Sequence, residues 1–318
     1  MSEPPKKSDL AAQVAWLYYV ANHTQQQIAE ELNVSRPTVQ RLVAAATESG
    51  YVQVRINHPT SDCMEVARRL KDRFGLKVCE VAPIEPNGDA RSLRAIAILG
   101  ATLAERYLSR SNVEVLAFGS GRTLKSVVDE IAEFRLPNLK ILSLAGAIAL
   151  DGSFNRYDCG LRMADKTEGK HFMLPVPVVA ATLADKDAWL RHPLHKVVDE
   201  LYSRAEAAFI GVGTIGPGSP LAEDGFITEQ NVQELINIGA VAESLGWPLD
   251  RNGRVIPSPL TDKVTSLTPD QMAKIPVIAV AGGSRKAAAI VAVLRGGFVS
   301  GLVTDFETAQ LILSITDR

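Results

Sequence analysis

The chain has 318 residues, of which 46% are hydrophobic and 22% charged, and its formal net charge is −2. These values are typical of a soluble globular protein of about two domains, and they exclude a globally basic nucleic-acid-binding protein. The apolar runs fall short of the roughly 20 residues that span a bilayer, and the start MSEPPKKSD lacks the apolar region of a signal peptide, so we expect a cytoplasmic protein without a membrane partner.

The first patterned stretch predicts two helices. Apolar residues spaced three and four apart run from Leu10 to Ala21, which indicates one face of an amphipathic helix. Thr24 stands three residues before Gln27, and this capping-box pairing predicts the start of a second, short helix. That helix is expected to end near Asn33, because asparagine tolerates the left-handed conformation found at helix ends.

A third helix is predicted directly after this corner, from about Ser35 to Ser49. Ser35 is a suitable N-cap, and Pro37 falls in the first turn, where its missing N–H costs nothing. Two helices joined by a tight turn form a helix-turn-helix, whose second helix lies in the major groove of DNA. The candidate DNA contacts are the polar residues at the start of this helix, namely Ser35, Arg36, Thr38, Gln40 and Arg41.

The segment Tyr51–Ile56 alternates polar and apolar residues, as a small wing does, so residues 1–57 are interpreted as a winged helix-turn-helix domain. A plain three-helix bundle would show a similar apolar stripe, but the tight corner and the polar start of the third helix favour DNA binding. The stretch TQQQIAEELNVSRPTVQRLVAAATESGYVQVRI resembles the winged helix-turn-helix of the SorC family of sugar-responsive transcription regulators. The resemblance implies double-stranded operator DNA as a partner.

Strands and helices alternate after the polar break that begins at His58. A strand is predicted over Val78–Val81, a long helix over Leu93–Tyr107 and another strand over Val113–Phe118. Repetition of this order predicts an α/β domain with a doubly wound, Rossmann-like sheet. Residues 58–318 are therefore expected to form a single domain for effector binding and oligomerisation.

Three predicted strands lead into glycine-rich loops, at Gly119–Thr123, Gly211–Thr214 and Gly282–Lys286. Ligands of open parallel sheets bind beyond the carboxyl ends of the strands, so the three loops are expected to form one site. Taken singly, each loop could also be a plain connection between a strand and a helix.

The residue types in these loops suggest a phosphate or another small anion as ligand. Glycine N–H groups, hydroxyls, helix starts near Thr123 and Arg285, and the point charge of Lys286 all suit an anion. Acceptors for sugar hydroxyls could come from three carboxylates that are individually typical surface acids, Asp224, Glu243 and Asp250. The candidate effector contacts are Gly119, Ser120, Gly121, Arg122, Thr123, Gly213, Thr214, Asp250, Gly283, Ser284 and Lys286.

The resemblance to the SorC family extends over this domain, through LAFGSGRTLKSVV, IGVGTIGPGSPLAEDGFIT and VAGGSRKAAAIVAVLRGGFVSGLVTDFETAQLIL. It implies a fold of the sugar-phosphate-isomerase type and a sugar phosphate, free sugar or polyol as effector, with Gly119–Thr123 and Lys286 at a phosphate. Two stretches depart from the family pattern, LAGA at 144–147 and AESLGWPLD at 242–250. Because Trp247 replaces a basic residue there, a bisphosphate is disfavoured and an unphosphorylated polyol stays open.

Neither a metal nor a cofactor is indicated. Cys63, Cys79 and Cys159 form no C-x-x-C pair, and Pro193 interrupts the H-x-x-H of His192 and His195. The spacing G-x-G-x-x-G at 211–216 matches a dinucleotide fingerprint, but the prolines that follow it prevent the helix start that such a fingerprint needs.

We therefore expect a transcriptional repressor of a carbohydrate or polyol catabolic operon, acting as a homodimer or homotetramer. The alternative is a sugar-phosphate isomerase or deaminase with an accessory helix-turn-helix. It is disfavoured because no acid–base cluster is evident and only Asp224 and Asp305 are candidates by position. The identity of the effector, its phosphorylation and the direction of its effect are left open.

Overall fold

The computed structural model describes residues 7–52, 61–83 and 89–316. The chain divides into two compact units, Met1–His58 and Pro59–Arg318. Among the described helices, none combines the length and apolar character that crossing a membrane requires.

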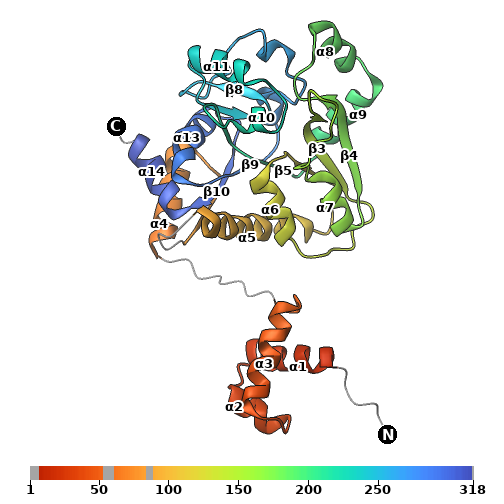
Figure 1. The fold of residues 1–318 in the computed structure, drawn as a ribbon, viewed down its shortest axis with the longest axis vertical. Helices are drawn as coiled ribbons and strands as arrows, with labels where there is room; N and C mark the ends of the chain where they lie inside the picture. The colour runs from red at the N-terminus through yellow and green to blue at the C-terminus, as the bar shows by residue number, and fades with distance from the viewer. Residues whose placement is uncertain (1–6, 53–60, 84–88, 317–318) are drawn as a thin grey trace. The chain divides into compact units, whose positions relative to one another are not determined.

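The N-terminal unit is a bundle of three helices around a small apolar core (Figure 1). The helices are α1 (Lys7–Tyr19), α2 (Gln25–Glu31) and α3 (Arg36–Glu48). The predicted capping box begins α2, since the Thr24 N–H donates to Gln27 Oε1 at 2.8 Å and the Gln27 N–H donates to Thr24 Oγ1 at 3.3 Å. All three helices were predicted, with ends that differ by a few residues.

The corner between α2 and α3 has the geometry of a helix-turn-helix. Asn33 takes a left-handed φ of +52°, and the Val34 N–H donates to the Ala29 carbonyl at 2.9 Å. Ser35 is the N-cap of α3, and its Oγ accepts from the Thr38 N–H at 3.3 Å. Most of the predicted wing strand, Tyr51–Ile56, lies outside the described residues.

The larger unit contains a seven-stranded sheet, all of whose strand pairs are parallel. Strands β2, β5 and β9 are buried throughout, as expected for a sheet covered on both faces. In order across the sheet the strands are β1 (Val78–Ala82), β10 (Gly301–Asp305), β9 (Val277–Val280), β5 (Ala207–Ile210), β2 (Val115–Phe118), β3 (Lys140–Ile148) and β4 (Lys170–Pro177).

Helices cover both faces of the sheet and bury two apolar cores. Alternate residues of β2 show the division, since Leu116 and Phe118 belong to one core and Val115 and Ala117 to the other. The first core packs under α5 (Asp89–Leu108), α6 (Arg122–Glu130) and α7 (Gly160–Thr167). The second packs under α4 (Ser61–Phe74), α9 (Pro193–Ser203), α13 (Ala287–Arg295) and α14 (Phe306–Thr316).

The strand order places a topological switch point between β2 and β5. From β2 the chain continues to β3 and β4 on one side, whereas from β5 it continues to β9 and β10 on the other. Loops that leave β2 and β5 therefore diverge and open a crevice beyond their carboxyl ends, which is where ligands of such sheets bind.

A small antiparallel sheet lies in the segment that follows β5. Its strands are β6 (Gly213–Thr214), β7 (Ala242–Ser244) and β8 (Trp247–Leu249). Short helices complete the unit, namely α8 (Leu183–Leu190), α10 (Pro220–Glu223), α11 (Glu229–Asn237), α12 (Pro269–Met272) and the 3₁₀ turns η1 (Thr261–Lys263) and η2 (Ser284–Lys286).

Candidate effector pocket and DNA-binding surface

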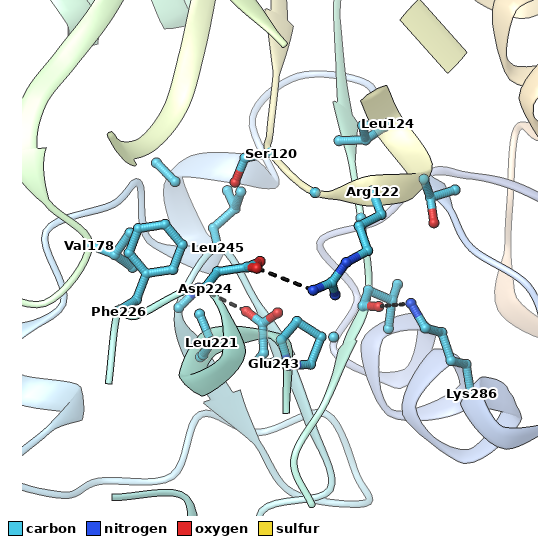
Figure 2. Close-up of a pocket in the computed structure, with 18 residues that line it drawn as sticks. Ser120, Arg122, Leu124, Val178, Leu221, Asp224, Phe226, Glu243, Leu245 and Lys286 are labelled. Atoms are coloured by element: carbon cyan, nitrogen blue, oxygen red, sulfur yellow. Dashed lines mark hydrogen bonds and ion pairs between the residues drawn. The ribbon is translucent and has the colours of Figure 1, made fainter. Parts of the chain in front are cut away.

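A pocket lies at the switch point, as Figure 2 shows. It is formed by the loops after β2 and β5, the α10 segment, the β7–β8 hairpin and η2. The lining residues are Ser120, Gly121, Arg122, Thr123, Leu124, Ala145, Val178, Gly211, Val212, Gly213, Pro220, Leu221, Asp224, Phe226, Glu243, Leu245, Gly246 and Lys286.

One wall of the pocket is the N-terminus of α6. Its N-cap is Gly121, which has a φ of +124° and no side chain to cap the helix. Few residues other than glycine adopt such a φ, so the backbone can turn here without a side chain entering the pocket. The first N–H groups of α6 and its positive dipole end are therefore available to an oxygen-rich ligand.

Arg122 connects this helix start to the α10 segment. Its guanidinium donates to Glu223 Oε2 at 3.0 Å, to Asp224 Oδ1 at 3.2 Å and to the Tyr157 hydroxyl at 3.2 Å. Burial raises the pKa of Asp224 above its ordinary value, and the charge of Arg122 opposes that shift. The Arg122 charge is thus already shared between two carboxylates.

Glu243 is a buried acid on β7 that approaches the loop after β5. Its Oε2 accepts from the Gly246 N–H at 3.0 Å, and a Cβ atom added at Gly213 would lie 1.9 Å from its Oε1. Only glycine leaves room for this carboxylate. Burial raises the pKa of Glu243, and the Gly246 hydrogen bond and the charge of Lys286 oppose that shift.

Lys286 reaches the pocket from η2. Its ammonium donates to the Val212 carbonyl at 3.0 Å, so the loop after β5 holds it in place. Burial lowers the pKa of Lys286 below its ordinary value, whereas the negative charge of Glu243 raises it. Glu243 and Lys286 are therefore an interacting acid and base in one pocket.

An apolar wall faces these charged groups. Val178, Phe226 and Leu245 are buried and line the pocket. Leu245 has a left-handed φ of +52°, which is uncommon for a residue with a branched side chain. Its Cδ2 would lie 3.1 Å from a Cβ atom at Gly119, which explains the small residue there.

The structure brings together part of the predicted effector set. Lining residues from that set are Ser120, Gly121, Arg122, Thr123, Gly213 and Lys286. Gly119, Thr214, Asp250, Gly283 and Ser284 do not line the pocket. Neither does the basic Arg285, whose neighbour Lys286 points there instead.

Local hydrogen bonds explain two of these differences. Asp250 Oδ1 accepts from the N–H groups of Asn252 at 2.8 Å and Arg254 at 2.9 Å, so the carboxylate stabilises its own turn. The Gly283 N–H donates to Asp305 Oδ2 at 3.0 Å and to Thr308 Oγ1 at 2.8 Å. The third glycine loop is therefore anchored to the buried Asp305 and reaches the pocket only through Lys286.

Trp247, which the sequence analysis placed where the family has a basic residue, offers no contact to a ligand in this pocket. It is buried, is absent from the pocket lining, and donates from Nε1 to the Leu267 carbonyl at 2.9 Å. The indole is therefore a packing residue of the small sheet. Glu243 and Asp224 line the pocket, although the sequence named them only as possible acceptors that are individually typical surface acids. The burial of Glu243 depends on the β7–β8 hairpin.

The G-x-G-x-x-G stretch at 211–216 does not open a helix. Gly213 begins β6 rather than a helix, and the first helix after the G-x-G-x-x-G stretch begins at Pro220. Within the described residues no group of three or more His, Cys, Asp and Glu side chains is placed to hold a metal.

The start of α3 presents polar side chains outward. Ser35, Arg36, Gln40 and Arg41 are exposed and Thr38 is half-buried, while Val39 and Leu42 face the core. Ser35 Oγ and Thr38 Oγ1 lie 2.8 Å apart, and Arg41 donates to Thr38 Oγ1 at 3.3 Å. This end of α3 therefore exposes the guanidinium groups of Arg36 and Arg41 and the amide of Gln40.

Comparison with known proteins agrees with this organisation. Residues 58–314 match the family described as "Putative sugar-binding domain", and residues 11–60 match the MarR family. The erythritol catabolism regulatory protein EryD of Brucella abortus (strain 2308) is 33% identical over 304 residues, covering 96% of each chain. The sorbitol operon regulator of Klebsiella pneumoniae is 27% identical over 318 residues, covering 96% of this chain and 97% of the relative.

A solved structure extends the likeness to the fold. The full-length sorbitol operon regulator SorC from Klebsiella pneumoniae superimposes with a TM-score of 0.78 at 22% identity, covering 98% of this chain and all of that one. The match of the sugar-binding family covers most of the chain, and a relative above 30% identity aligns over nearly its full length. This chain belongs to the SorC family of sugar-binding transcriptional regulators.

Proposed function

We propose that this protein represses a carbohydrate or polyol catabolic operon, and that a small sugar, polyol or sugar phosphate in the switch-point pocket changes its affinity for operator DNA. The observation that carries the proposal is a built polar pocket on the same chain as a helix-turn-helix. Two relatives are named for erythritol catabolism and for the sorbitol operon, which supports a polyol or sugar pathway.

Operator contacts are assigned to the start of α3. Arginine can pair with guanine in the major groove or neutralise a phosphate, and glutamine can pair with adenine. Arg36, Gln40 and Arg41 are exposed and suit these roles, while Ser35 and Thr38 also stabilise the start of the helix. We assign the same five residues that the sequence predicts.

Effector contacts are assigned to the lining residues of the pocket. The predicted members that line it, Ser120 to Thr123, Gly213 and Lys286, are joined by Glu243 and Asp224. Gly119, Thr214, Gly283 and Ser284 are assigned a supporting role in the shape of the loops. Asp250 is not proposed as a contact, because its carboxylate closes its own turn.

Self-association is part of the proposal, as a homodimer or homotetramer in the cytoplasm. Helix-turn-helix proteins read operator half-sites in pairs, so two copies of α3 are needed. The C-terminal end of α1 supports this, because Trp16 and Tyr19 on the helix and Val20 directly after it are 58%, 41% and 61% exposed. Pairing of two such ends would bury apolar surface without burying a charge.

The expected mechanism is linkage between the two sites. An effector that binds two quaternary arrangements unequally changes operator affinity, and operator DNA must change effector affinity by the same factor. Catalysis is not part of the proposal. Of the two acids that were candidates by position, Asp305 accepts hydrogen bonds from Gly283 and Thr308, and Asp224 pairs with Arg122. The described lining residues of the pocket include no histidine.

The test is operator binding with and without effector. The full-length protein is expected to retard DNA from upstream of its own or a neighbouring catabolic operon, and one sugar or polyol of a panel should change that affinity at least several-fold. Turnover of pentose or hexose phosphates above background would favour the isomerase alternative. Failure to bind any upstream DNA would contradict the regulator assignment.

A further inference from the structure

The charges around the pocket carry an inference about the chemical class of the effector. Two cationic side chains line the pocket, Arg122 and Lys286, and two carboxylates face them, Asp224 and Glu243. A third carboxylate, Glu223, does not line the pocket but contacts the same Arg122. Arg156 likewise lies outside the lining, and its charge acts on Asp224. Among these described residues the acids therefore balance the bases.

Arg122 is the first cation that an anionic ligand would meet at the start of α6. Figure 2 shows its guanidinium directed toward Asp224 across the pocket, with the ion pair drawn. The second ion pair, to Glu223 at 3.0 Å, uses the same terminal nitrogen. A phosphate would have to compete with two carboxylates for this group, and would leave them close to its own negative charge.

Lys286 does not supply the missing positive charge. Burial lowers the pKa of Lys286 and raises the pKa of Glu243, so burial disfavours the charged form of both groups. The opposite charge of each group favours the charged form of the other. When both groups are ionised, the negative charge of Glu243 cancels the positive charge of Lys286 within the pocket. The ionised pair therefore adds no net positive charge that would attract an anion.

The N-terminus of α6 is the remaining positive feature. A helix end is equivalent to roughly half an elementary charge, which is less than the charge of one carboxylate. Its free N–H groups are donors to any oxygen, including that of a hydroxyl. This end of the helix can therefore bind a neutral oxygen-rich ligand without requiring an anion.

Hydrogen-bond types in the pocket also match hydroxyl groups. Asp224 and Glu243 offer acceptors, while Lys286, Arg122 and the α6 backbone offer donors. A hydroxyl both donates and accepts, whereas a phosphate dianion only accepts and so cannot donate to either carboxylate. The apolar wall of Val178, Phe226 and Leu245 suits the C–H face of a carbon chain.

We propose that the effector is an uncharged polyhydroxy compound, a polyol or free sugar, whose hydroxyls donate to Asp224 and Glu243. This inference rests on the proposed function, since it names the ligand class of the same pocket. Arg122 is then a specificity-determining residue. Its ion pairs to Glu223 and Asp224 already use the charge of its guanidinium, so this group does not bind the phosphate of an ester of the same compound.

The experiment compares each neutral compound with its own phosphate ester. Calorimetric titration of the full-length protein uses erythritol, ribitol and sorbitol, the monophosphate ester of each, and inorganic phosphate. At least one polyol is expected to bind, with its ester weaker by about tenfold or more because an uncompensated charge meets the carboxylates. The affinity of the polyol should not change between low and high salt.

A variant outside the lining tests the charge argument directly. Glu223→Gln removes one of the two acids on Arg122, and Glu229→Gln makes the same change at an exposed position in the first turn of α11. Glu223→Gln should strengthen binding of the phosphate esters and inorganic phosphate by about threefold or more and leave the polyol unchanged. The Glu229 control should change neither.

The outcomes separate the inference from the function on which it rests. If an ester binds more tightly than its parent polyol and releases the operator, the proposed regulator function stands and the proposal of an uncharged effector is overturned. A polyol that binds without any change in operator affinity supports the neutral pocket and overturns the linkage. Unchanged phosphate binding in Glu223→Gln would refute the role assigned to Arg122.

Discussion

Replacement of Lys286 by methionine removes the one ammonium group in the described pocket lining and keeps an unbranched side chain that is one atom shorter. Two interactions are lost together. The hydrogen bond to the Val212 carbonyl at 3.0 Å disappears, and the buried Glu243 loses the positive charge that opposes its rise in pKa. We therefore expect a less stable protein that no longer responds to its effector.

The size of the effect follows from these contacts. A hydrogen bond from a charged donor contributes about 1.5–3 kcal/mol, and part of the loss is recovered when Glu243 takes up a proton and becomes neutral. A net loss of about 1–2 kcal/mol in the free energy of unfolding is expected. For a unit of this size each kcal/mol lowers Tm by about 2–4 °C, so the transition should move down by several degrees.

Thermal unfolding followed by circular dichroism, with and without the polyol identified by calorimetry, measures both effects. Lys196→Met is the matched control, because Lys196 is exposed on α9 and away from the pocket lining. The double variant Lys286→Met with Glu243→Gln should be less destabilised than the sum of the singles, by about 0.5–3 kcal/mol. A Lys286→Met protein with the parent Tm and the parent ligand-induced shift would refute the reasoning.

Three further predictions concern other parts of the chain. Arg41→Ala should weaken operator binding by about 1–3 kcal/mol, measured by fluorescence anisotropy, with polyol binding unchanged; equal loss of both would indicate misfolding instead. Gly213→Ala should weaken polyol binding by about tenfold or more in calorimetry, because its Cβ atom would lie 1.9 Å from Glu243 Oε1 and displace the carboxylate. Parent-like affinity would show that Glu243 is not a contact. Burial lowers the pKa of His171, so the unfolded chain binds this proton more readily. The stability that the neutral imidazole contributes should therefore be present above the unfolded pKa, about 6.5, and be lost as the pH falls through the folded value. His171→Gln should flatten that part of the pH–stability curve, and an unchanged curve would contradict the assignment.

The helix-turn-helix could be predicted because its signals are local. The Thr24–Gln27 capping box, the left-handed Asn33 and the Ser35 N-cap each act within four residues of chain, and each has the conformation expected of it. Hydrogen bonds at such short separation depend little on the rest of the fold. The wing was predicted from the alternation over Tyr51–Ile56, and it stays a prediction because most of that segment lies beyond the described residues.

The positions of Glu243 and Asp250 show where local reasoning stops. Both are acids in one stretch of sequence, yet Glu243 is buried in the pocket and Asp250 accepts hydrogen bonds from its own turn. The difference arises because β7 pairs with β6 and so brings Glu243 over Gly213. That pairing joins segments nearly 30 residues apart in the sequence.

By itself the sequence determined the alternation of strands and helices, the glycine-rich ends of three strands and the helix-turn-helix, since periodicity and capping are properties of neighbouring residues. Only the tertiary structure decided which charges share the pocket. Strand order placed the loops after β2 and β5 together, turned Gly283 toward Asp305, and set Arg122 between Glu223 and Asp224. The balance of charge that we propose selects the effector is a sum over side chains that meet only when the sheet has formed.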